Sequence, residues 1–153
     1  MFIVLDDLLR HAGFLPMRLA LGTDDKKTLR RELFGDSHYF CIAEVKAGKW
    51  KVLEYRDNPH ADPAIADKPP LVLQFLGDCT AFLSRSLRKG AFVLFAKNGK
   101  IPLVTSHETI DDALSAIARR ELHRFKRFDL VEDGFVPLKE VDIHLLSRAR
   151  RTP

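Results

Sequence analysis

A proline-rich segment in the middle of the chain limits the available folds more than any other feature. Residues 57–70 read DNPHADPAIADKPP, with four prolines in 14 positions. Proline lacks a backbone N–H and fixes φ, so neither a helix nor a strand can run through this stretch. Regular structure must therefore form separately before and after it. A loop of this length inside a compact domain is often functional.

The part of the chain before this segment has the pattern of β-strands. Residues 18–23, 39–45 and 50–56 are rich in apolar, aromatic and β-branched side chains, which favour strands. Ala47-Gly48-Lys49 is typical of a tight turn, so we expect the last two strands to form an antiparallel hairpin.

The part after the segment alternates between helical and strand patterns. Thr109 and Asp112 form a capping box, and apolar residues follow at helical spacing. Pro102 suggests that its strand lies at a sheet edge. The expected elements are a helix over 71–76, a strand over 80–84, a helix over 87–98, a strand over 101–105, a helix over 109–125 and a short helix within 135–151. Because strands joined by helices pair in parallel, we expect one α/β domain with a mixed sheet, in the order of a ribonuclease H-like three-layer fold.

The composition is that of a globular domain. The chain has 153 residues, of which 46% are hydrophobic and 30% charged, and no apolar run is long enough for a membrane span. The start lacks the basic residues and the cleavage site of a signal peptide, so we expect a cytoplasmic protein. Cys41 and Cys79 show no metal-binding spacing and are expected to be small buried thiols.

Basic charge is concentrated toward the carboxyl terminus. The formal net charge is +4, and residues 119–153 hold nine Lys/Arg against six Asp/Glu. Residues 123–128, HRFKRF, mix basic and aromatic side chains as single-strand binders do, although they also fit the end of an amphipathic helix. A non-catalytic interaction module that binds an acidic protein or RNA through this basic tail is therefore an open alternative.

Several short motifs occur together in a fixed order: ALGTDD at 20–25, Phe-Gly at 34–35, DNPHAD at 57–62, Asp-Cys at 78–79 and TIDDAL at 109–114. As a set, they resemble the dinitrogenase iron–molybdenum cofactor-binding family, the small domains related to NifX and to the C-terminal part of NifB. The resemblance covers residues 18–122. It implies a ribonuclease H-like fold that binds or transiently carries an iron–sulfur or iron–molybdenum cluster between donor and acceptor proteins. The resulting division is an N-terminal extension (1–17), a cofactor-binding-like domain (18–125) and a basic C-terminal extension (126–153).

The resemblance also suggests where a site would lie. The family commonly reads His-Phe-Gly where this chain has Leu33-Phe34-Gly35, and Asp36 stands in place of a basic residue. Leucine cannot ligate a metal, and an aspartate would repel an anionic cluster. His60 matches the histidine of the family's Asn-Pro-His loop, and His38 lies close to the motif at the entry of a strand. We therefore expect Gly35 to offer a backbone anion nest and His38 and His60 to act as metal ligands.

The expected fold also raises a nuclease as a less favoured alternative. Two-metal phosphodiester chemistry requires three or four converging carboxylates. The candidates are Asp24, Asp25, Glu44, Glu54 and Asp78. Nothing in their spacing fixes them side by side, and the chain has no nucleophile motif, Walker A loop or dinucleotide-binding fingerprint. We therefore do not expect an enzyme.

Overall fold

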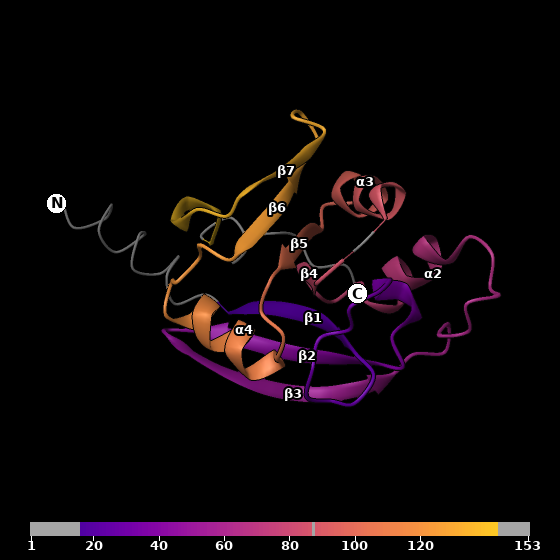
Figure 1. Cartoon of the computed structure of the whole chain (residues 1–153), viewed down its shortest axis with the longest axis horizontal. Coiled ribbons are helices and arrows are strands. Elements are labelled where there is room, and N and C mark those ends of the chain that lie inside the picture. Colours follow the sequence, from indigo (N-terminus) through magenta and orange to yellow (C-terminus); the bar gives the residue numbers. More distant parts are fainter. Residues whose placement is uncertain (1–15, 87, 144–153) are drawn as a thin grey trace, which may run out of the picture.

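One seven-stranded mixed sheet forms the centre of the protein (Figure 1). The computed structural model describes residues 16–86 and 88–143. In chain order the strands are β1 (Met17–Thr23), β2 (Tyr39–Lys46), β3 (Lys49–Asp57), β4 (Ala81–Ser84), β5 (Ile101–Thr105), β6 (Phe125–Asp129) and β7 (Gly134–Pro137). In the sheet they lie in the order β3-β2-β1-β4-β5-β6-β7, so β4 occupies the middle.

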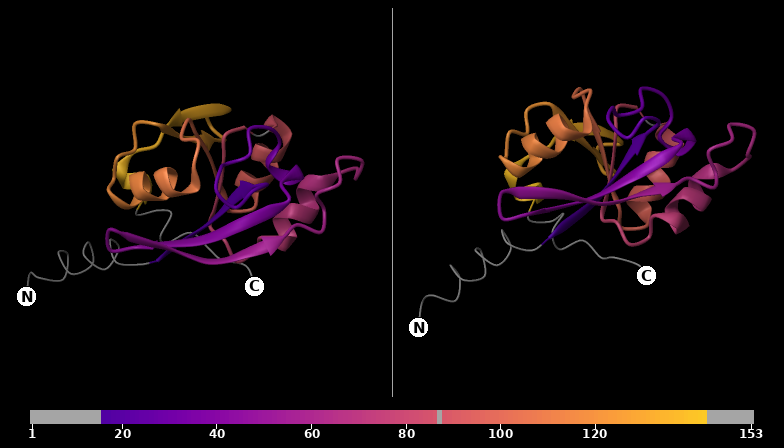
Figure 2. Two further views of the ribbon diagram at one scale, coloured as in Figure 1. Left: turned by 60° about the horizontal axis from the view of Figure 1, so that its bottom comes forward. Right: turned by 90° about the horizontal axis from the view of Figure 1, so that it is seen from below.

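Helices cover both faces of the sheet, which gives three layers (Figure 2). Helices α2 and α3 and the 3-10 turn η1 pack on one face, whereas α4 packs on the other. Their bounds are η1 (Phe34–Asp36), α2 (Lys68–Phe75), α3 (Lys89–Lys97) and α4 (Ile110–Ala118). The turn η1 and the proline-rich loop that leads into α2 therefore lie on the α2 and α3 side of the sheet.

The alternation of side chains along β1 explains why two cores form. Leu19 and Leu21 belong to the core beneath α4, together with Leu114 and Ile117. Ala20, between them, faces the aromatic core beneath α2 and α3. Successive residues of a strand point to opposite faces, and both faces are covered here. The three residues at 19–21 are for this reason all apolar and fully buried.

The strands are connected in two different ways. β1, β2 and β3 pair antiparallel, and the turn at Ala47 and Gly48 has positive φ at both positions, as a type I′ hairpin requires. β4 pairs in parallel with β1 and β5, and α2 and α3 provide the crossovers. The predicted hairpin, the parallel units and the three-layer α/β class are thus confirmed, whereas the finer ribonuclease H-like assignment stays a prediction.

The segment after α4 differs from the sequence prediction. The helix is capped at Thr109 as predicted, where the hydroxyl accepts from the Asp112 N–H over 3.1 Å, but it ends early, at Ala118. Arg120 then takes a positive φ of 63°, which a right-handed helix cannot contain. Residues 125–129 form β6, so the prediction that HRFKRF ends a helix is wrong.

The strands β6 and β7 extend the sheet beyond β5 (Figure 1). Phe128 of β6 and Phe135 of β7 pack with Phe92 of α3, which anchors this hairpin to the fold. The boundary predicted between residues 125 and 126 lies within β6. β5 is consequently an interior strand, so the edge position predicted from Pro102 is wrong. The missing N–H is tolerated because pairing with β6 begins only at Leu103.

The limits of α2 and of the last expected helix also differ from the predictions. α2 begins at Lys68 rather than after Pro70, because the N–H groups of a first helical turn have no partner within the helix and prolines fit there. The short helix expected within 135–151 begins at Glu140, after β7, and the rest of that stretch lies outside the described residues. None of the helices in the described part of the chain is long and apolar enough to cross a membrane.

Candidate functional site

The residues Leu33–His38, here called the lip, contain η1 and lead into β2. Phe34 anchors the lip, because its ring is buried and stacks on Phe82 with the centroids 5.6 Å apart. The lip also passes close to the end of β1, since a Cβ atom at Gly22 would collide with the Ser37 hydroxyl. A glycine at this position therefore allows the lip to lie against the carboxyl end of β1.

Asn58 attaches the proline-rich loop to the lip. Its side-chain amide donates to the carbonyl oxygens of Gly35 and Ser37 over 2.9 and 2.8 Å. Its backbone N–H donates to the His38 carbonyl over 3.0 Å, and its side-chain oxygen accepts from the His60 N–H over 2.9 Å. Asn58 is only 8% exposed, so water competes little for these bonds. The loop thus begins against the entry to β2, which places the two histidines on neighbouring segments.

Lys68, at the start of α2, makes a second connection between the loop and the lip. Its ammonium group pairs with Asp36 over 2.5 Å and donates to the Asp62 carbonyl over 2.8 Å. The lysine is 8% exposed. Its stem passes so close to Gly35 that a Cβ atom there would lie 3.1 Å from Lys68 Cδ. Gly35 therefore leaves the space through which the lysine reaches and neutralises Asp36.

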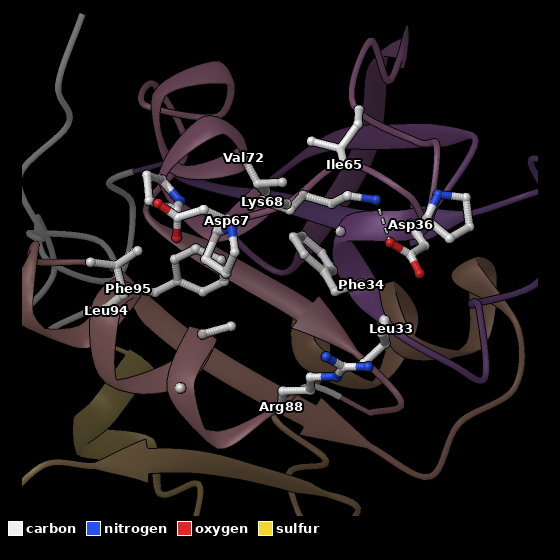
Figure 3. Close-up of a pocket in the computed structure, with 17 residues that line it drawn as sticks. Leu33, Phe34, Asp36, Ile65, Asp67, Lys68, Val72, Arg88, Leu94 and Phe95 are labelled. Atoms are coloured by element: carbon white, nitrogen blue, oxygen red, sulfur yellow. Dashed lines mark hydrogen bonds and ion pairs between the residues drawn. The ribbon is translucent and has the colours of Figure 1, made fainter.

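A cavity of about 750 Å³ opens between the lip, the loop and the helices α2 and α3 (Figure 3). Its apolar wall includes Leu33, Phe34, Ile65, Val72, Leu94 and Phe95. Its charged groups are Asp36, Asp67, Lys68 and Arg88. Because the lip follows β1 and α3 follows β4, the cavity lies beyond the carboxyl ends of two adjacent parallel strands. Open α/β sheets commonly bind ligands at such a position.

Gly35 lies in the wall of this cavity. The N–H groups that follow it, on Asp36 and Ser37, donate to the carbonyls of Leu33 and Phe34 within the 3-10 turn. These two N–H groups are thereby used to form the turn and are not directed at an anion. The clearest role of Gly35 in the structure is the close passage of the Lys68 stem.

His38 is oriented by Asp24, the residue that follows β1. Asp24 Oδ1 accepts from the His38 backbone N–H over 3.0 Å and lies 2.8 Å from ring Nδ1. Partial burial opposes the ionisation of Asp24, but the hydrogen bonds from His38 and from Arg30 outweigh it and hold the Asp24 pKa below its usual value. In the neutral ring, an ionised Asp24 favours the tautomer with the proton on Nδ1 and the lone pair on Nε2. The His38 side chain is 66% exposed, so the ring is accessible.

His60 lies in the loop, and its ring packs edge-on against Phe75 of α2, with the centroids 6.3 Å apart. The two predicted ligands thus lie on the two segments that Asn58 joins. Within residues 16–86 and 88–143, no group of three or more His, Cys, Asp or Glu side chains is arranged to hold a metal ion. A metal at the lip would therefore take only one or two ligands from this part of the chain.

The carboxylates considered for a nuclease do not converge. Asp24 is engaged with His38. Asp25 accepts from the N–H groups of Thr28 and Lys27, which closes the turn after β1 and lowers the Asp25 pKa to about 2. A Thr-Asp-Asp cluster after a strand commonly forms a turn of this kind.

The other three acidic residues belong to an ion-pair network that joins β1, β2 and β3 to the segment before β4. Asp78 accepts from Arg56 through both carboxylate oxygens, over 2.8 and 2.6 Å, and from Arg18 over 3.2 Å. The hydrogen bonds from Arg56 are the main reason that the Asp78 pKa falls to about 2. Glu54 pairs with Arg56, and Glu44 lies near Arg18. The network fastens strands together and leaves no converging carboxylates for a pair of metals.

Both cysteines are buried and free, as the sequence predicted. Burial raises the pKa of the Cys41 and Cys79 thiols to about 12. Both side chains are 0% exposed, so neither sulfur is accessible to a cluster bound at the surface of the folded protein.

Two residues that shape this region, Asn58 and Lys68, were not identified as site residues from the sequence, and Asp24 was considered only as a nuclease carboxylate. Asn58 precedes a proline where a strand ends, a context in which asparagine commonly bonds to nearby backbone groups, so a local role was predictable. Nothing in the sequence pairs Lys68 with Asp36, because 32 positions separate them. Their proximity follows only from the way the loop returns to the lip.

Comparison with known proteins adds an independent finding. The profile of the family described as "Dinitrogenase iron-molybdenum cofactor" matches residues 16–120, a region that ends before β6. A solved structure from Methanocaldococcus jannaschii, provisionally assigned as a dinitrogenase, has a TM-score of 0.50 and 16% identity, and the match covers 69% of this chain and 90% of that one. A Thermotoga protein provisionally assigned as NifB, of the DUF35 family, has a TM-score of 0.53 and 20% identity, over 73% and 93%. At these identities the likeness concerns the fold alone. No functionally curated protein matches the chain.

Proposed function

This chain belongs to the dinitrogenase iron–molybdenum cofactor family, and we propose that it binds an iron–sulfur or iron–molybdenum cluster, or a precursor of one, as transient cargo. The binding surface would be the lip and the first part of the loop, with His38 and His60 as protein ligands. A donor protein would supply the cluster and an acceptor would receive it. We assign this exchange to the cytoplasm, where reducing conditions fit two free thiols.

The observation that carries the proposal is the pairing of His38 with Asp24. A metal-binding histidine almost always donates its other ring N–H to a carboxylate, carbonyl or water, which fixes its tautomer and increases its basicity. Asp24 occupies this position, 2.8 Å from Nδ1. The ring is thus prepared to offer Nε2 to iron from an exposed location.

A small number of protein ligands suits a carrier. Imidazole is a good ligand for iron. With His38 and His60 as the protein ligands, the remaining coordination would come from the sulfides of the cluster or from small molecules. Such a cluster would leave the protein more readily than one held by four thiolates. His60 would approach from the segment that Asn58 holds against the lip.

The charge of the lip does not oppose an anionic cargo. Asp36 stands where the family commonly has a basic residue, and alone it would repel a cluster. Lys68 pairs directly with Asp36, so the two together are neutral. Leu33 provides no ligand, and in this proposal His38 takes over the role of the histidine that the family has at that position.

The test is anaerobic reconstitution of the full chain with a preformed cluster, followed by iron, sulfide and molybdenum analysis. We expect stoichiometric uptake by the native chain and loss of most of it in His38→Ala and in His60→Ala. Asp24→Asn keeps the imidazole but changes its hydrogen bond, so it should weaken cluster binding by about 10- to 100-fold. His123→Ala, which removes an exposed histidine outside the lip, is the matched control and should bind as the native chain does.

Two results would contradict the proposal. Equal uptake by the native chain and all the variants would place the cluster elsewhere, and no uptake by the native chain would reject the carrier function. The non-catalytic interaction module would then be the leading alternative. Its test is binding to RNA or to an acidic protein at increasing salt, which weakens contacts made by basic side chains.

A further inference from the structure

The large cavity shares residues 33–36 with the lip, but it differs chemically from the histidine surface proposed for the cluster. None of the described residues that line it is a cysteine or a histidine, and apolar side chains form most of its wall (Figure 3). Its volume of about 750 Å³ lies within the range of sites for small organic molecules. Such a wall favours a hydrocarbon or aromatic group, because water released from apolar surface contributes to binding.

The wall is held in place by the fold. Phe34 and Phe95 line the cavity and also belong to the aromatic core, where each is 1% exposed. Ile65 comes from the loop that Lys68 attaches to the lip. Leu94 comes from α3. A ligand would therefore meet a largely preformed surface, as is usual for small-molecule sites.

Lys68 and Arg88, the two basic side chains that line the cavity, differ in their pairing. Lys68 is neutralised by Asp36. Arg88 lines the cavity and is exposed, and it forms no ion pair with any carboxylate in residues 16–86 and 88–143. In Figure 3 its guanidinium group lies apart from Asp67 and from the Lys68–Asp36 pair. Arg88 is also the N-cap residue of α3, and no side chain caps this helix, so its first N–H groups add positive potential at the same place.

We propose that this cavity binds a small organic anion with an apolar body, of the class of medium-chain carboxylates. The apolar body would contact the wall formed by Leu33, Ile65 and Leu94, and the carboxylate would pair with Arg88 at the start of α3. His38 and His60 take no part in this site. The inference therefore does not depend on cluster binding.

The probe is octanoate, measured by isothermal titration calorimetry on the full chain without a cluster. Its neutral analogue is 1-octanol and its short analogue is acetate, and octanoate should bind more tightly than either. Arg88→Gln should weaken octanoate binding about tenfold, as expected for the loss of a charge-assisted hydrogen bond, and should leave 1-octanol unaffected. Lys97→Gln, at the other end of α3, is the charge-matched control and should bind as the native chain does.

A second variant is designed to fill the cavity and to leave the fold intact. Gly90 lines the cavity, and a Cβ atom added to it meets nothing within 4 Å. Gly90→Leu also replaces a poor helix former inside α3, so its Tm should be at least that of the native chain. We expect this variant to lose octanoate binding and to retain cluster uptake, which separates this test from the test of the carrier function.

Three results would overturn the inference. Octanoate that fails to bind the native chain at millimolar concentration would reject the site. Equal affinity for octanoate and 1-octanol would reject the anion as a determinant. Octanoate binding that persists in both Gly90→Leu and Arg88→Gln would place the ligand outside this cavity.

Discussion

The side-chain amide of Asn58 donates to the carbonyl oxygen of Gly35 over 2.9 Å, across 23 positions of sequence. This bond joins the first residue after β3 to the 3-10 turn η1 before β2. It is largely shielded from water, so leaving either group without a partner would be costly. The start of the proline-rich loop is thereby fixed, and the geometry of the lip depends on it.

We expect Asn58→Ala to lower the free energy of unfolding by about 2 to 3 kcal/mol, because the carbonyls of Gly35 and Ser37 lose their side-chain donor. Urea denaturation measures the change, and hydrogen exchange should become faster at the His60 N–H. Asp57→Ala, an exposed neighbour, is the control and should change stability by less than about 0.5 kcal/mol. Equal effects of the two substitutions would show that these bonds contribute little.

Removing one partner of the Lys68–Asp36 pair should destabilise the protein much more than removing both charges. The two side chains are 10% and 14% exposed. Lys68→Met leaves an uncompensated carboxylate and should destabilise the protein by about 3 kcal/mol, whereas a variant that combines it with Asp36→Asn should recover most of this loss. A double-mutant cycle by chemical denaturation measures the coupling. Additive effects would mean that the pair is not coupled in solution.

The Arg56–Asp78 pair should make the stability of the fold depend on pH in the acid range. The Asp78 pKa is lowered from 3.8 to about 2. A carboxyl group whose pKa is lowered by folding contributes stability above its pKa in the unfolded state. That contribution is lost as the pH falls through its pKa in the folded state. We therefore expect part of the stability to disappear between about pH 4 and pH 2, and Asp78→Asn to lack that part. Thermal unfolding across this range measures it, with the exposed Glu132→Gln as control. Parallel curves for the native chain and Asp78→Asn would contradict the assignment.

The N-cap of α4 should contribute a modest amount to the free energy of unfolding. Thr109→Ala removes the acceptor of the Asp112 N–H and should cost about 1 kcal/mol of unfolding free energy. Thr109→Ser retains a hydroxyl oxygen and should recover most of this loss. Both are measured by urea denaturation followed by circular dichroism. A Thr109→Ser variant as unstable as Thr109→Ala would point to packing of the threonine methyl group instead.

The two thiols should be inert in the folded protein. Cys41 and Cys79 are each 0% exposed, and burial raises their pKa to about 12, so the reactive thiolate is scarce. A disulfide reagent such as 5,5′-dithiobis(2-nitrobenzoate) should label neither thiol at pH 8 and both in guanidinium chloride. Rapid labelling of the native protein would contradict the buried state of these residues.

The sequence predicts well where neighbours along the chain decide the structure. The turn at Ala47 and Gly48, the strands on either side of it and the cap at Thr109 depend on contacts within a few residues, and all three are as expected. The end of α4 does not follow such local rules. HRFKRF suits a helix as well as a strand, and its conformation is decided by pairing with β5 and by the packing of Phe128 on Phe92 of α3.

The amino-acid sequence by itself determined the α/β class, the hairpin, the proline-rich loop, the buried thiols and the resemblance to the cofactor family. It identified His38 and His60 as candidate ligands without showing what surrounds them. The tertiary structure alone decided that Asp24 orients His38, that Lys68 neutralises Asp36 and that an apolar cavity lies beside both segments. The reason is physical: backbone propensities act over a few residues, whereas these contacts join positions 14 and 32 apart, which meet only after the sheet register and the return of the loop are set.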